Sequence, residues 1–143
     1  MTIAAILRHK GSEVARVAPT ATVADISKQL AQRRIGAVLV MDTADQLLGI
    51  VSERDIVASL SEHGARVLEM TAAQLMTRVL HTVGPKTTVP EAMEMMTLRR
   101  VRHLPVLDSG RLMGVVSIGD VVKARIDQQA QEVDSLKAYV AGA

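Results

Sequence analysis

The chain has 143 residues, of which 48% are hydrophobic and 22% charged, and its 17 basic and 15 acidic residues give a net charge of +2. This composition excludes wholesale disorder, and the length suits one domain or two small repeats that share a core. The chain has no Cys, Trp or Phe and a single Tyr, which excludes disulfides, thiolate zinc sites and an aromatic platform for stacking nucleic-acid bases.

No segment has the features of a membrane span or of a secretory leader. The longest apolar run, residues 35–41, is far shorter than the roughly 20 residues that a spanning helix needs. Residues 1–10 lack a charged leader followed by an apolar stretch, and a chain without Cys suits a reducing compartment. We therefore expect a cytoplasmic protein without a membrane segment.

A first set of elements occupies residues 13–61. A strand, a helix, the two strands of a hairpin and a second helix are predicted in that order, at residues 13–17, 23–34, 37–41, 47–51 and 52–61. The first of these helices begins at a capping box, Thr22-x-x-Asp25. The helical spacing of apolar residues predicts four core side chains, those of Val23, Ile26, Leu30 and Ala31.

A linker at residues 62–76 follows the first set and contains a short helix that begins at Thr71. Residues 2–8, ahead of the first set, are predicted to form the counterpart of this helix. The two short helices would then each precede one set of elements.

The second set begins at Thr88-x-x-Glu91, with Pro90 in the first helical turn. Two strands are predicted at residues 104–107 and 112–116, and a helix from Ser117 onward. Three side chains of the first helix are predicted to lie in the core, those of Met93, Met96 and Leu98. The final helix carries a weak apolar stripe through Ile126, Val133, Leu136 and Val140. This stripe indicates either a helix lying on the body of the protein or a dimer contact.

The two sets are copies of one sequence. A shift of 66 residues places residues 83–89 on residues 17–23. A shift of 65 then places Gly114-Val-Val-Ser117-Ile-Gly-Asp120 on Gly49-Ile-Val-Ser52-Glu-Arg-Asp55. Since the period has the length of a whole small domain, the chain is predicted to contain two tandem repeats rather than a solenoid.

These features resemble the cystathionine-β-synthase (CBS) domain pair, also called the Bateman module, of the stand-alone bacterial type. The resemblance rests on the doubled Gly-hydrophobic-x-Ser-x-x-Asp segments, on Arg102-His-Leu-Pro-Val106 and on the repeated order of elements, and it covers almost the whole chain. It implies an α+β fold in which two tandem CBS repeats pack about a pseudo-twofold axis. We divide the chain into a first repeat with an N-terminal segment, a linker, a second repeat and a helical extension, at residues 1–61, 62–76, 77–126 and 127–143.

The resemblance implies a regulatory ligand and a homodimer. The ligand would be an adenine nucleotide bound in a cleft between the repeats: AMP first, or ADP, ATP, an NAD-type dinucleotide or S-adenosylmethionine. Asp55 and Asp120 match the family carboxylate that accepts hydrogen bonds from the ribose hydroxyls, and Ser52 and Ser117 match the hydroxyl beside it. A carboxylate has two acceptor oxygens for the two donors of a cis-diol. The same Ser-x-x-Asp pattern is also a capping box that any helix can use for stability alone.

The second repeat is expected to handle the phosphate charge. Arg102 and His103 stand where family members often place basic groups toward the phosphate, whereas the first repeat has Gly36 and Ala37 there. Arg54 is a further candidate from the first repeat. The alternative is that the arginines near Arg102 form a solvated basic edge.

The adenine ring is expected to lie between aliphatic walls, because the chain has no Trp or Phe to stack on it. The candidate wall residues are Ile35, Gly36, Ala37 and Val51 in one cleft and Val101, Leu104, Pro105 and Val116 in the other. An ordinary place in the core is the alternative for these side chains.

No catalytic motif is present, so we expect a binding protein rather than an enzyme. Residues 84–88 only superficially resemble a phosphate-binding loop, because Pro85 aligns with Pro19 of the first repeat. No His pair has ligand spacing, so no metal site is expected. The chain is expected to act as an energy or redox sensor. The alternative is a ligand-independent dimeric module that regulates a protein partner, and nucleic-acid binding is not expected from so small a net charge.

Overall fold

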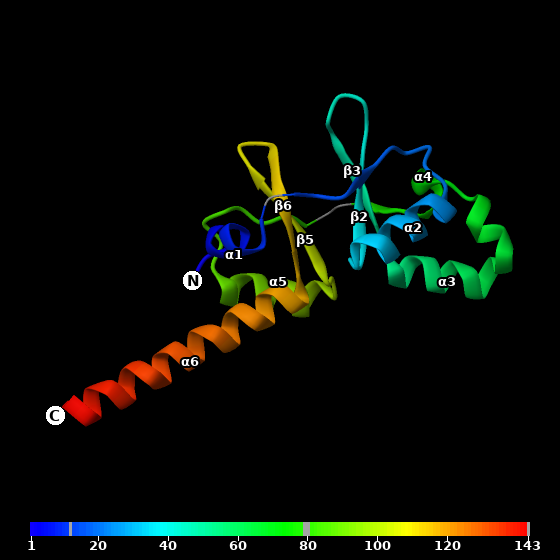
Figure 1. Cartoon of the computed structure of the whole chain (residues 1–143). Helices are drawn as coiled ribbons and strands as arrows, with labels where there is room; N and C mark the ends of the chain where they lie inside the picture. The colour runs from blue at the N-terminus through cyan, green and yellow to red at the C-terminus, as the bar shows by residue number, and fades with distance from the viewer. Residues whose placement is uncertain (12, 79–80, 143) are drawn as a thin grey trace. The chain divides into compact units, whose positions relative to one another are not determined.

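The computed structural model describes residues 1–11, 13–78 and 81–142 (Figure 1). The chain divides into two compact units, each built around one repeat. The first-repeat unit is Glu13–Leu80, and the second-repeat unit combines Met1–Ser12 with His81–Ala143. Helices and strands alternate within both units, which confirms the predicted α+β class with two tandem repeats.

The first-repeat unit is a four-stranded sheet with helices packed on it. Its elements are β1 (Arg16–Val17), α2 (Val23–Arg33), β2 (Ala37–Met41), β3 (Leu47–Ser52), α3 (Glu53–His63), the 3₁₀ helix η1 (Gly64–Glu69), α4 (Ala72–Leu75) and β4 (Thr77–Arg78). The strands lie in the order β1-β2-β3-β4, with β1 parallel to β2 and the other pairs antiparallel. The predicted hairpin is confirmed, and the first strand is shorter than the predicted residues 13–17.

The second-repeat unit is built around a hairpin. Its elements are α1 (Ile3–Lys10), α5 (Val89–Arg99), β5 (His103–Asp108), β6 (Arg111–Ser117) and α6 (Ile118–Gly142). The strands β5 and β6 pair antiparallel, and Val83 adds a parallel bridge to Val106 on the other side of β5. This bridge stands where β1 lies in the first repeat, since residue 83 aligns with residue 17.

Most of the predicted core residues are buried. Val23, Ile26 and Leu30 of α2 pack in the core of the first-repeat unit, and Met96 packs in that of the second. Two predictions are wrong: Ala31 is exposed, and Leu98 is 71% exposed. Both residues lie near the C-terminal end of their helix, on a face that no other element covers.

Each of the two short helices packs on the other repeat, not on the one that it precedes in the sequence. In the second-repeat unit, the amides of Ile3 and Ala4 donate to the carbonyls of Thr87 and Pro85 at 2.8 and 2.9 Å. In the first-repeat unit, the amides of Ala72 and Ala73 donate to the carbonyls of Ala21 and Pro19 at 2.8 and 2.9 Å. Since Pro85 aligns with Pro19, α1 and α4 make matching contacts, and they are counterparts as predicted.

This exchange differs from the division drawn from the sequence. The N-terminal segment was placed with the first repeat in residues 1–61, whereas the structure packs it with the second repeat. The linker, residues 62–76, packs with the first repeat instead of standing between the two. The physical reason is burial: Ile3 is fully enclosed among side chains of the second-repeat core, such as Val89 and Leu104.

The glycine that opens each repeated motif is explained by a close approach. A Cβ on Gly49 would lie 2.7 Å from the backbone carbonyl oxygen of Thr77 and 2.7 Å from the sulfur of Met76. A Cβ on Gly114 would lie 2.8 Å from a methyl group of Leu7 on α1. The missing side chain therefore lets the segment after α4 pack on β3 and lets α1 pack on β6.

The helix α6 is continuous from residue 118 to 142, and all its residues from 129 onward are exposed. The interpretation that this extension lies on the body of the protein is therefore wrong. Within the described part of the chain, no helix combines the length and the apolar character needed to cross a membrane.

Candidate functional site

The repeated Ser-x-x-Asp motif of the second repeat joins the end of β6 to the start of α6. The amide of Ser117 donates to Oδ2 of Asp120 at 2.8 Å, and the amide of Asp120 donates to Oγ of Ser117 at 3.2 Å. These reciprocal bonds satisfy two backbone donors that the first helical turn leaves open. Capping is thus part of the role of both residues, as the alternative interpretation held.

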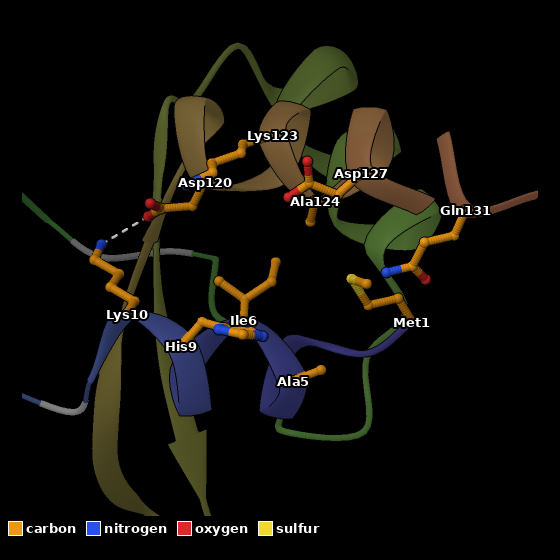
Figure 2. A pocket seen from close by; sticks show the side chains of 10 residues that line it. All are labelled: Met1, Ala5, Ile6, His9, Lys10, Asp120, Lys123, Ala124, Asp127 and Gln131. Carbon is orange, nitrogen blue, oxygen red and sulfur yellow. Dashed lines mark hydrogen bonds and ion pairs between the residues drawn. The ribbon is translucent and has the colours of Figure 1, made fainter. Parts of the chain in front are cut away.

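A lysine from the other end of the chain also binds Asp120. Nζ of Lys10, the last residue of α1, lies 2.6 Å from Oδ2 of Asp120 and donates to the carbonyl oxygen of Val115 at 2.9 Å. Figure 2 shows Lys10 reaching from α1 to the carboxylate at the start of α6. The Asp120 side chain is 25% exposed, so solvent still reaches the ion pair.

The contacts of Asp120 lower its pKa. Burial by itself raises the pKa of the carboxyl, but the hydrogen bond and charge of Lys10, together with the hydrogen bonds from Ser117, outweigh burial and bring the pKa below its ordinary value of 3.8. The carboxylate is therefore ionised at neutral pH and available as an acceptor for neutral donors.

Replacing Lys10 with Met is expected to raise the pKa of Asp120, because burial persists while the largest lowering contact is lost. In the wild type, the lowered pKa adds stability above the unfolded pKa of Asp, about 3.9, and this stability disappears as the pH falls through the folded pKa. The Lys10→Met variant should show less of this acid-dependent loss. The measurement is a carbon NMR titration of the Asp120 carboxyl together with unfolding free energies over the same pH range.

The matched control is Lys123→Met, because Lys123 lines the same pocket and has no ion pair with Asp120 among the described residues. It should leave the titration of Asp120 close to that of the wild type. An unchanged Asp120 titration in Lys10→Met would contradict the assigned role of the ion pair.

A pocket of about 560 Å³ opens between α1 and α6, within the second-repeat unit. Ten residues line it: Met1, Ala5, Ile6, His9, Lys10, Asp120, Lys123, Ala124, Asp127 and Gln131. Figure 2 shows the ion pair of Lys10 and Asp120 at one end and Gln131 with Met1 at the other. The volume lies in the range of small-molecule sites, and the walls combine an apolar floor with a few charged groups.

The equivalent carboxylate of the first repeat, that of Asp55, accepts hydrogen bonds on both of its oxygens. Oδ2 of Asp55 accepts from the amide and from the hydroxyl of Ser52, each at 2.9 Å, and Oδ1 accepts from the hydroxyl of Thr77 at 3.4 Å. In Asp120, the hydrogen bonds from Nζ of Lys10 and from the amide of Ser117 both end at Oδ2. The two motifs therefore share the cap, but among the described residues no hydrogen bond to Oδ1 of Asp120 corresponds to the one that Oδ1 of Asp55 accepts from Thr77.

The basic candidates lie beside the Ser117 motif. Arg102 is exposed, and its carbonyl accepts from the amide of Ile118 at 2.8 Å. His103 is half-buried and pairs with Ser117 across β5 and β6. The structure thus brings Arg102 and His103 to the end of the hairpin where α6 begins, next to Ser117.

The equivalent backbone of the first repeat has the same arrangement. The carbonyl of Gly36 accepts from the amide of Glu53 at 2.9 Å, and Ala37 pairs with Ser52. Arg54 is exposed in the first turn of α3. Gly36 and Ala37 therefore border the Ser52 motif without bringing a charged side chain to it.

Several of the candidate wall residues belong to the core. Val51, Leu104 and Val116 are fully buried in the two core clusters, and Pro105 is also buried. Val51, Leu104 and Val116 therefore have the ordinary place in the core that was their alternative. Pro105 follows Leu104 in β5, and neighbouring residues of a strand point to opposite faces, so its place in a ligand wall stays a prediction. The remaining candidates are partly exposed: Ile35, Gly36, Ala37 and Val101.

Sequence reasoning missed most of the pocket. Of the charged and polar residues that line it, only Asp120 is among the predicted site residues, and Lys10, Lys123, Asp127 and Gln131 are not. Helical spacing could have placed Asp120, Asp127 and Gln131 on one face of α6, but nothing local shows that α1 faces them. Among the described residues, no cluster of three or more His, Asp or Glu side chains could hold a metal ion.

Comparisons with known proteins agree with this geometry. The sequence pattern of the CBS domain matches residues 6–62 and again residues 72–127. The structure of a CBS-domain protein from Agrobacterium tumefaciens is 39% identical and superposes with a TM-score of 0.84, over 87% of this chain and 92% of that one. A CBS-domain protein from Pyrobaculum aerophilum, solved in complex with AMP, is 26% identical with a TM-score of 0.74, over 84% of this chain and 89% of that one.

A relative in Arabidopsis thaliana, a mitochondrial CBS-domain protein, is 38% identical over 125 residues, which are 85% of this chain. The chain spans 61% of the length of that protein. The two matches to one domain pattern coincide with the two sequence repeats and with their matching hydrogen bonds. The chain therefore belongs to the CBS-domain family and contains a pair of CBS domains.

Proposed function

We propose that the chain binds an adenine nucleotide through Asp120 and acts as an energy or redox sensor rather than as an enzyme. The candidate ligands are AMP, ADP, ATP and NAD(H), with AMP first. The complex of the Pyrobaculum relative with AMP supports this ligand class. The proposed role is regulatory, as a binding module whose ligand changes what the module does.

The proposal rests on one observation: the carboxylates of Asp120 and Asp55 differ in the hydrogen bonds that their oxygens accept. A ribose offers two hydroxyl donors on neighbouring carbons, and a bound carboxylate must accept both. Asp120 is ionised, borders a pocket and receives its bonds from Lys10 and Ser117 on Oδ2. Asp55 already accepts on both oxygens. Asp120 is therefore the stronger candidate for binding the ribose.

Cationic side chains near Asp120 suit the phosphate. Lys10 and Lys123 line the pocket, and Arg102 is exposed beside Ser117. Guanidinium and ammonium groups both form charge-assisted hydrogen bonds to phosphate oxygens. Asp127 shares the pocket, so the phosphate is expected nearer to Lys10 and Arg102 than to the middle of α6.

Ligand binding would act on the N-terminal helix. Lys10 holds the Oδ2 atom of Asp120 that a ribose hydroxyl would share, so the nucleotide competes with the contact that joins α1 to α6. A ligand shifts such an equilibrium by no more than its difference in affinity for the two arrangements. The position of α1 is then the proposed output of the sensor.

A thermal-shift screen tests the function. Wild-type protein is mixed with AMP, ADP, ATP, NADH or S-adenosylmethionine, and the unfolding transition is followed. A ligand present at a hundred times its dissociation constant should add about 2.7 kcal/mol to the free energy of unfolding. Absence of a shift with all five compounds would contradict the proposal and favour the ligand-independent module that regulates a protein partner.

We further propose that the chain forms a homodimer. Large apolar side chains are exposed on two helices, among them Val57 and Leu60 on α3 and Leu136 on α6. An apolar helical face left exposed is a candidate for a protein contact where its residues form a continuous patch. The alternative is that these helical faces bind a protein partner that the chain regulates.

A further inference from the structure

The C-terminal half of α6 is a helix without tertiary packing. Figure 1 shows this half extending away from α1 and α5 of its own unit, and all its residues from 129 to 142 are exposed. Val133, Leu136 and Val140 are 50%, 64% and 67% exposed. An isolated helix of this length is marginal in water, because most helical stability comes from packing an apolar face. This half of α6 therefore needs a partner.

The apolar residues of α6 follow a seven-residue repeat. One series is β-branched at every position, and a second series runs between its members. The two series are Ile126, Val133 and Val140, and Val122, Gln129 and Leu136. Alternating spacings of four and three residues are the pattern of a two-stranded coiled coil. The series spans residues 122–140, or roughly 28 Å of helix.

The two series together form a seam along α6, and this seam lies on a different face of the helix from the one that packs in the second-repeat unit. Val121 and Ala124 are the buried residues of α6. At 100° per residue, the centre of the seam is rotated about a third of a turn from them. One helix can therefore hold its own domain with one face and bind another helix with the next.

The residue types and charges of the seam indicate which helix binds to it. β-branched residues throughout the first series, with Leu136 in the second, favour two strands over three or four. Glu132 and Lys137 flank the seam five residues apart, so in a parallel pair each Glu132 faces the partner's Lys137. In an antiparallel pair, the position of Glu132 would instead meet the same position of the second helix, and the position of Lys137 likewise, so like charges would come together. The seam is thus complementary to a second copy of itself.

We propose that residues 122–140 form a parallel two-stranded coiled coil with the same helix of a second copy. The inference rests on the proposed homodimer and adds the surface that joins it. Gln129 is the one polar member of the seam, and a polar residue in such a position fixes the register at some cost in stability.

Sedimentation across a concentration series tests the interface. Leu136→Asp places a charge in the seam, and Ala138→Asp is the matched control, because Ala138 is exposed on the same half of α6 but lies on the face opposite the seam. The wild type and Ala138→Asp should dimerise alike, and Leu136→Asp should raise the dimer dissociation constant at least about tenfold, which corresponds to about 1.4 kcal/mol. Far-UV circular dichroism checks that both variants keep their folded domains.

The outcomes separate the interface from the homodimer. A monomeric wild type at every concentration would overturn the homodimer and the coiled coil together. A dimeric Leu136→Asp with wild-type affinity would overturn the coiled coil alone.

A single introduced cysteine tests the direction of the helices, since the chain has no Cys of its own. Val140→Cys should give a disulfide-linked dimer on mild oxidation, because a parallel pair brings the two C-terminal ends together. A dimer that forms no such link would overturn the parallel arrangement.

Discussion

Replacing Asp120 with Asn is expected to weaken nucleotide binding about 10-fold to 100-fold. The substitution keeps one acceptor for the amide of Ser117 but removes the negative charge that would accept from the ribose. Hydrogen bonds to charged groups contribute about 1.5–3 kcal/mol, and each 1.4 kcal/mol changes a dissociation constant tenfold. Calorimetric titration of the wild type and the variant, with the nucleotide that gives the largest thermal shift, measures the loss.

The matched control is Asp55→Asn, which makes the same change in the capping box of the first repeat. Because both oxygens of Asp55 already accept from Ser52 and Thr77, this variant should bind the nucleotide nearly as the wild type does. Equal losses in the two variants would show that the repeats share the ligand. Wild-type affinity in Asp120→Asn would remove the ribose-binding role from this carboxylate.

Replacing Ile3 with Ala should lower the free energy of unfolding by about 2–5 kcal/mol, the range for truncating a large aliphatic side chain in a packed core. Ile3 is fully buried in the cluster that contains Val89 and Leu104. The effect follows from the exchange of the short helices, since a loosely attached N-terminal segment would tolerate the change. Urea unfolding followed by circular dichroism gives the measurement.

Leu98→Ala is the control for this prediction. Leu98 belongs to the same unit but is 71% exposed, and truncations at exposed positions usually change stability by less than about 0.5 kcal/mol. A loss in Ile3→Ala as small as that of Leu98→Ala would show that α1 is not part of the second-repeat core.

The repeats could be predicted from the sequence because their evidence is local. Each hairpin lies between two turn-forming segments, and each Ser-x-x-Asp follows a strand directly, so short-range patterns are enough to locate them. The predicted caps of α2 and α5 are present, with the amides of Asp25 and Glu91 donating to the threonine hydroxyls at 3.2 Å.

The remainder depends on contacts between distant parts of the chain. Lys10 and Asp120 are 110 residues apart, and no periodicity connects them. The packing of α1 on the second repeat likewise uses backbone hydrogen bonds to Pro85 and Thr87, which leave no trace in local composition. For Leu104 and Val116, a strand pattern could not distinguish a side chain facing the core from one facing a ligand, because only the folded sheet decides which face is covered.

The most direct test of nucleotide binding at Asp120 is a crystal structure of the wild-type protein grown with the nucleotide that gives the largest thermal shift. The account predicts electron density for the ribose with both hydroxyls within hydrogen-bonding distance of the Asp120 carboxylate, and with Nζ of Lys10 moved away from Oδ2 or shared with the ligand. A ribose bound elsewhere, with the Lys10–Asp120 pair unchanged, would contradict it.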